Sequence, residues 1–185
     1  LRALAQRFTA HVTGLKELAE VLRELPDLLR RGALRIAMRK AAELIEADAK
    51  RRAPVLKTPD PRRRAGTLRD AISARVSVPK GGNEVRARVG VRRLTKQTIS
   101  EFKQRTGRGA TANPDDPFYA MMVERGVTRR QGGKIVQIPA RPFMRPALLA
   151  NAMQVVERFR EEARREIDVT ARKLLLHKGR RASGA

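Results

Sequence analysis

"AISARVSVPKGGNEVRARVGVR", residues 71–92, is the stretch whose pattern decides the fold. Apolar residues alternate with polar ones on both sides of the segment PKGGN, and a period of two predicts two β-strands. The glycines between the strands tolerate positive φ, so an antiparallel hairpin is expected. One face of this hairpin is apolar. The other face is basic and carries Arg75, Arg86, Arg88 and Arg92.

Helical patterns flank the hairpin on both sides. Apolar residues recur at helical spacing over 15–25, over about 27–52, and for nearly thirty residues from Pro146 onward. Short strands are predicted over 8–13 and over 134–138. The sequence therefore predicts an α+β fold, in which N-terminal helices and a long C-terminal helix cover a small, mostly antiparallel sheet. The many alanines in 27–52 would let a neighbouring helix or sheet approach closely.

Residues 1–176 are expected to form a single domain, followed by a basic disordered tail at 177–185. Extended loops are predicted at 54–66, which contains three prolines, and at 93–117, with one short helical piece around Ile99 and Phe102. Thr67 is expected to cap a short helical turn. The stretch 118–126 is expected to form a short apolar element that ends at Gly126. No apolar run is long enough to span a membrane.

Charge is the strongest compositional signal, because 42 Lys and Arg stand against 19 Asp and Glu, a net charge of +23. This balance predicts a polyanionic partner, whether nucleic acid, an acidic protein surface or anionic lipid. A codon bias toward arginine and alanine would explain the same composition without a partner. The cations are dispersed, which suits a large polyanion better than a single base-reading element. The absence of cysteine excludes disulfides and thiolate chemistry.

Few residues are suited to catalysis. Asp115 and Asp116, together with Glu124, could hold a divalent metal in a nuclease. Asp-Pro clusters are ordinary turn chemistry, however, and the more ordinary role for Glu124 is a salt bridge to an arginine. The glycines of TGRGAT lack the lysine and the strand–helix context of a phosphate loop. No enzymatic activity, metal or cofactor is expected.

Four motifs occur in a fixed order: AKRRAP (49–54), AGTLRDAI (65–72), FYAMMVERG (118–126) and ARPFMRPAL (140–148). This succession resembles the neck proteins of long-tailed bacteriophages, which are head–tail connector or tail-completion components. The resemblance covers about residues 14–160, and the loop at 54–66 is longer than is usual in the family. The residues that mark it are Pro54, Gly66, Leu68, Tyr119, Glu124, Gly126, Pro142, Phe143 and Pro146.

The resemblance implies a structural, non-enzymatic virion protein. It implies a homo-oligomeric ring, a hexamer in the first place and a dodecamer as the alternative, that joins the tail tube to the head connector around the DNA channel. The implied partners are adjacent connector or head-closure proteins, tail-tube or tail-terminator proteins, and genomic double-stranded DNA in a non-specific contact. The hairpin arginines could face either DNA or an acidic neighbouring ring. The implied location is the virion neck, after assembly in the bacterial cytoplasm.

Two other functions remain open at the level of sequence. The first is a basic nucleic-acid-binding module that uses the hairpin arginines as its platform. The shortage of aromatic residues counts against it, since single-strand binders stack bases on aromatic rings. The second is a metal-dependent nuclease that uses Asp115, Asp116 and Glu124.

Overall fold

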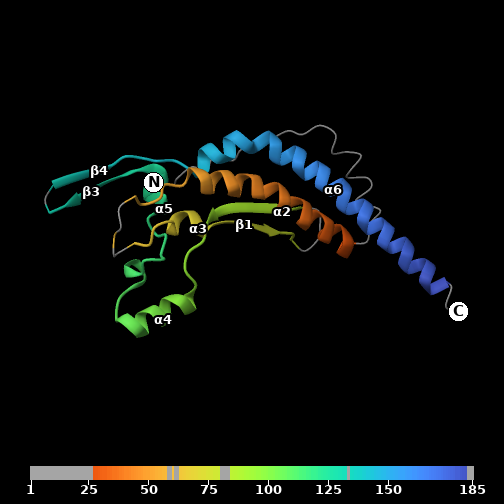
Figure 1. Cartoon of the computed structure of the whole chain (residues 1–185), viewed down its shortest axis with the longest axis horizontal. Coiled ribbons are helices and arrows are strands. Elements are labelled where there is room, and N and C mark those ends of the chain that lie inside the picture. The colour runs from red at the N-terminus through yellow and green to blue at the C-terminus, as the bar shows by residue number, and fades with distance from the viewer. Residues whose placement is uncertain (1–26, 58–59, 61–62, 80–83, 133, 183–185) are drawn as a thin grey trace.

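The computed structural model describes residues 27–57, 60, 63–79, 84–132 and 134–182, and within them three layers lie one over another (Figure 1). These layers are a β-hairpin, the helix α2 (Asp27–Arg52) and the helix α6 (Met144–Ala182). The helix predicted over 27–52 and the α+β class are confirmed. The strand predicted over 8–13 and the helix predicted over 15–25 lie outside the described residues.

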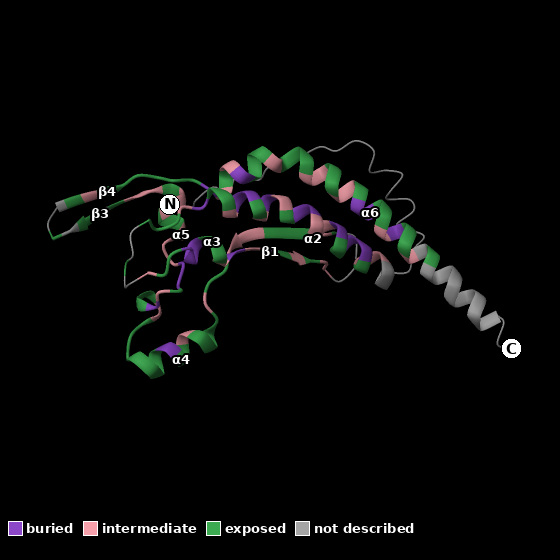
Figure 2. Cartoon of the chain, viewed as in Figure 1, coloured by how far each residue is buried: buried purple, intermediate pink, exposed green. Residues whose placement is uncertain are grey.

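Small residues bring α2 and α6 together. Ala37 of α2 and Ala163 of α6 are both fully buried, and they share one cluster with Ala33 and Ile167. Because alanine side chains are short, the two helices can pack closely along this stripe, which Figure 2 shows as buried. α6 therefore covers α2, and α2 in turn covers the sheet, so the long helix is an outer layer over most of its length.

The predicted hairpin is present as β1 (Ile72–Ser77) and β2 (Arg86–Val91), paired antiparallel. Its register places Ile72 opposite Val91 and Ala74 opposite Val89, so the apolar side chains of both strands share one face. Ile72 is 1% exposed and Ala74 is 2% exposed. The strict alternation in the sequence is therefore explained by burial of one face against α2.

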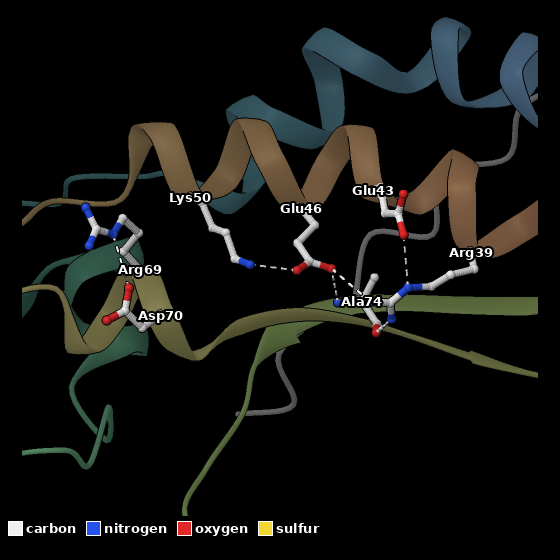
Figure 3. Close-up of polar contacts among 7 residues, drawn as sticks. All are labelled: Arg39, Glu43, Glu46, Lys50, Arg69, Asp70 and Ala74. Atoms are coloured by element: carbon white, nitrogen blue, oxygen red, sulfur yellow. Dashed lines mark hydrogen bonds and ion pairs between the residues drawn. The ribbon is translucent and has the colours of Figure 1, made fainter.

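Side chains of α2 cover the outer edge of β1 (Figure 3). Glu46 Oε2 accepts the backbone N–H of Ala74 at 2.7 Å, and the Arg39 guanidinium donates to the Ala74 carbonyl. Burial alone would raise the pKa of Glu46, but hydrogen bonds from Lys50 and from the Ala74 amide outweigh it and lower that pKa below its ordinary value. Glu46 thus serves as an ionised acceptor for a strand edge that has no further strand to pair with.

A second two-stranded sheet, separate from the first, consists of β3 (Val127–Gln131) and β4 (Lys134–Ile138). The strand predicted over 134–138 is confirmed, but the expectation of a single sheet is wrong, because β4 pairs with β3 and with no strand of the hairpin. The sequence of β3, VTRRQ, has no apolar alternation that would reveal it. This β3–β4 ribbon projects from one end of the molecule beside α5 (Ala120–Arg125) (Figure 1).

The predicted loop at 93–117 contains more helix than expected, whereas the described residues of 54–66 contain none. Most of 93–117 is occupied by α4 (Lys96–Thr106) and the 3-10 helix η1 (Ala110–Ala112). Thr95 caps α4 by accepting the Thr98 N–H at 3.1 Å.

Thr67, which the sequence predicts as a helix cap, is instead the first residue of α3 (Thr67–Ala71). The capping position belongs to Gly66. The Thr67 hydroxyl donates to the Arg64 carbonyl at 2.8 Å.

α6 continues to Ala182, so residues 177–182, which the sequence assigns to a disordered tail, are helical in the structure. Arginine and lysine are good helix formers, and their charge is favourable near the C-terminal end of a helix. Residues 183–185 lie outside the described part. Among the helices of the described ranges, none is both long enough and apolar enough to cross a membrane.

Candidate functional site

The sequence motifs meet where α2 ends and α6 begins. Leu68 and Phe143, each 1% exposed, belong to one buried cluster with Ile72, and Tyr119 and Val123 pack against it. The four motifs are far apart in the chain, so their convergence is a property of the fold. Pro54, Gly66, Leu68 and Tyr119 also line one cavity of about 310 Å³.

Glu124, at the end of α5, caps the beginning of α6. Its Oε2 accepts the backbone N–H groups of Phe143 at 2.8 Å and Met144 at 3.0 Å, and its Oε1 accepts that of Arg145 at 3.0 Å. The first amides of a helix have no partner within the helix, and the helix dipole favours an anion there. The role of Glu124 is therefore to cap a helix, and not to form the arginine ion pair that the sequence favoured.

The turn after α5 requires glycine. Gly126 has φ of 71°, and a Cβ at this position would lie 2.8 Å from the backbone nitrogen of Ala140 and 2.9 Å from the carbonyl oxygen of Ile138. Further along, Pro142 is exposed, and Pro146 is the third residue of α6. A proline in the first turn loses no helical hydrogen bond. Glycine and prolines thus fix the path from α5 through the ribbon to α6.

One contact at the cavity was missed by the sequence reasoning. The Arg63 guanidinium lies 4.5 Å from the centre of the Phe118 ring and 5.3 Å from that of Tyr119. Burial raises the pKa of Tyr119 above its ordinary value, although nearby Arg63 opposes this. Two features of the sequence could have indicated this contact: an arginine-rich loop, and an adjacent Phe–Tyr pair in a chain that has few aromatic residues. The predicted loop at 54–66 is therefore anchored to the body at Arg63.

The four hairpin arginines lie on one open face, which we call the arginine face: Arg75, Arg86, Arg88 and Arg92. Arg75 stands directly opposite Arg88 in the β1–β2 register, and like charges facing each other across a strand pair are destabilising. Arg86 pairs with neighbouring Glu84 at 2.5 Å. Neither Arg75 nor Arg88 forms an ion pair with any residue that the structure describes. A bound anion would relieve this repulsion.

Two of the three carboxylates of the nuclease hypothesis have partners of their own, and the third is buried. Asp115 pairs with Arg64, Asp116 is buried, and Glu124 caps α6. Over the ranges that the structure describes, no group of three or more His, Asp or Glu side chains is placed to hold a metal ion. The geometry therefore gives the nuclease hypothesis no support.

Comparison with known proteins identifies a family. A family model described as "Bacteriophage HK97-gp10, putative tail-component" matches residues 16–126, more than half of the 185-residue chain. The matched range includes α2, the hairpin and α5, and it ends at Gly126 before the β3–β4 ribbon and α6. No curated protein and no solved structure matches the chain.

Proposed function

We propose, from the premise that this chain belongs to the HK97-gp10-like family of bacteriophage tail components, that it forms a ring in the neck of the virion. As a tail component it is a structural protein of the virion and interacts with other virion proteins. The finer role is tail completion, in which the ring joins the tail tube to the head connector around the DNA channel.

The observation that carries the neck role is the arginine face. Arg75 and Arg88 repel each other and have no ion pair within the described residues, so this surface favours a large anionic partner. DNA passing through a neck offers phosphates without requiring sequence readout, and an acidic face of an adjacent ring offers carboxylates. Both partners fit a face that is open on the side away from α2.

A closed ring with head-to-tail contacts needs two different surfaces on each subunit. The β3–β4 ribbon projects from one end of the molecule, while the hairpin lies along its body (Figure 1). A protruding element at one end and a flat face along the body would supply the required asymmetry. A hexamer is the first expectation and a dodecamer is the alternative.

The size of the purified full chain in solution tests this proposal. Light scattering and negative-stain electron microscopy are expected to reveal a closed ring of about six or twelve subunits. A stable monomer that binds duplex DNA with a steep salt dependence would contradict the ring and favour a nucleic-acid-binding module.

We assign the protein no catalytic role. The test is incubation of the full chain with plasmid DNA and magnesium, in which no cleavage is expected. Cleavage that is lost in Asp115→Ala would instead establish the nuclease function.

A further inference from the structure

A groove runs along the outer edge of β2. Two cavities, of about 710 Å³ and about 270 Å³, share Met144 and Glu124, so they adjoin along this edge. The larger cavity reaches α2 and the start of α6, and the smaller one reaches α5. The apolar side chains that line the two cavities include Met38, Ile45, Leu148, Val155, Met121 and Phe143.

The pattern of hydrogen bonds between β1 and β2 leaves backbone groups on the outer edge of β2 unpaired. Arg92 N–H donates to the Ala71 carbonyl at 2.8 Å, and bonded and non-bonded pairs alternate along an antiparallel ladder. The N–H and C=O groups of Ala87, Val89 and Val91 therefore point away from β1. The equivalent groups of Ala74 on β1 are bonded by α2, whereas no described residue bonds those of Val89.

The rim of this groove is positively charged. Arg88, Arg93 and Arg145 line it, are exposed, and form no ion pair with the residues that the structure describes. Glu124 is the one acidic residue among the lining side chains, and its carboxylate is already bonded to the α6 amides. Charge complementarity therefore favours an acidic occupant.

We propose that the β2 edge receives an extended segment of another virion protein in which apolar and acidic residues alternate. The inference rests on the proposed function for the class of partner. In strand addition the main chain supplies hydrogen bonds, and alternate side chains point to opposite faces. Apolar side chains of the incoming strand enter the groove beside Val89, and acidic ones meet Arg88. A second copy is the poorer occupant, because the chain carries +23 and its own ribbon has the basic sequences VTRRQ and KIVQI.

The probe is a short blocked peptide of alternating valine and glutamate, tested against the full-length chain. Fluorescence anisotropy is expected to detect binding, and amide hydrogen exchange is expected to slow at Ala87, Val89 and Val91 when the probe binds. Val89→Pro removes an outward N–H that β1 does not use, so the hairpin is retained. This variant is expected to bind the probe roughly tenfold more weakly. That change corresponds to a loss of about 1.4 kcal/mol in binding free energy, which is the size expected when the hydrogen bond from the Val89 N–H is lost.

Matched controls separate strand addition from simple charge attraction. Arg75→Gln, on the arginine face and outside the groove, is expected to leave probe affinity within about twofold, whereas Arg88→Gln with Arg145→Gln weakens it and reduces its salt dependence. A valine–lysine peptide is expected not to bind. Circular dichroism confirms that each variant is folded.

Three results would overturn the inference. The first is absence of probe binding, and the second is binding that Val89→Pro does not weaken. The third is slow exchange at Val89 without the probe, which means that the chain itself or a second copy already covers the edge. The mass of the particle in solution is measured separately. An intact ring that does not bind the probe would contradict the strand-addition proposal and leave the ring proposal standing. A monomer that binds the probe would contradict the ring proposal and leave strand addition standing.

Discussion

Glu124 accepts the backbone N–H of Phe143 at 2.8 Å, and this bond joins the end of α5 to the residue that precedes α6. The family match ends at Gly126, so Glu124 is among the last matched residues while Phe143 lies beyond the match. A carboxylate within the family region therefore positions a helix outside it. The core that Phe143 completes depends on this contact, since the ring of Phe143 packs in the cluster that contains Leu68 and Ile72.

Removal of the Glu124 carboxylate is expected to destabilise the fold. Glu124→Ala leaves the first amides of α6 without acceptors, and the free energy of unfolding should fall by about 2 kcal/mol in urea denaturation. Glu124→Gln keeps one acceptor oxygen and should lose less. The control is Glu43→Ala, an exposed residue paired with Arg39 at 3.4 Å, which should change stability by less than about 0.5 kcal/mol. Equal effects at the two positions would contradict the capping role.

Alanine at Gly126 is expected to be more harmful than alanine at Gly107. Both glycines have positive φ, at 71° and 68°, so each substitution carries a left-handed backbone cost of roughly 1–2 kcal/mol. At Gly126 the new Cβ also meets backbone atoms, whereas at Gly107 it meets nothing within 4 Å. Melting temperatures of the two variants measure the difference. A Gly126→Ala protein as stable as Gly107→Ala would show that the turn can relax.

Truncation of Phe143 is expected to cost folding or assembly. Phe143→Ala should lower the free energy of unfolding by about 3–5 kcal/mol, because it leaves a cavity in the core. Met153, on the exposed side of α6 and 72% exposed, provides the control, and Met153→Ala should have little effect. Denaturation and light scattering report on both properties. An unchanged melting temperature together with intact assembly would refute the structural role of Phe143.

Stability is expected to fall in mild acid. A hydrogen bond from Lys40 at 2.7 Å lowers the pKa of Glu162 below its ordinary value of 4.5, despite burial, which raises it. The pKa of Asp48 is also lowered, because bonds from Arg52, Arg51 and Asn151 outweigh the effect of burial. A carboxyl whose folded pKa is depressed stabilises the fold above its unfolded pKa, and this stabilisation is lost as the pH falls toward the folded pKa.

Denaturation midpoints measured from pH 7 downward should therefore decline below about pH 4.5. Glu162→Gln should be less stable at pH 7 and should show a shallower decline. The pKa of Lys40 is raised by the same ion pair, so Lys40 stays charged throughout this acid range. The same slope in the variant and the parent would exclude Glu162 as a cause.

Reversing one charge of the arginine face should raise stability while weakening polyanion binding. Arg75→Glu replaces a like-charge pair with an attractive pair opposite Arg88, which should stabilise the hairpin by roughly 0.2–1 kcal/mol. Binding to duplex DNA, followed by anisotropy at low salt, should weaken in the same variant. Arg105→Glu on α4 is exposed and serves as the control for net charge. Identical binding by the two variants would show that only total charge matters.

The sequence predicted what depends on local periodicity. The hairpin and α2 were predicted because their apolar residues alternate or recur over many positions, and burial against a single neighbour imposes that pattern. α4 was underestimated, since only Ile99 and Phe102 provide apolar anchors. Its boundaries were nevertheless readable, with Thr95 as the N-terminal cap and Gly107 at the C-terminal end.

What the sequence did not reveal depends on contacts between distant segments. Strand β3, and with it the pairing that forms the ribbon, was missed because β3 carries arginines at positions where apolar alternation would be expected. The role of Glu124 was missed because its partners are backbone amides 19 to 21 residues away, which leave no trace in side-chain pattern. The stacking of Arg63 on Phe118 likewise requires knowledge of where the loop folds.

The covering of Ala74 by Glu46 and Arg39 has a consequence for solubility. Each copy presents one open edge on this hairpin and one that α2 has closed. Subunits with a single unpaired strand edge can form a dimer through that edge, but they cannot extend into a continuous sheet. Edge-to-edge pairing through the hairpin therefore stops at two copies, because the bonds from α2 to Ala74 block the second edge and so oppose the growth of fibres.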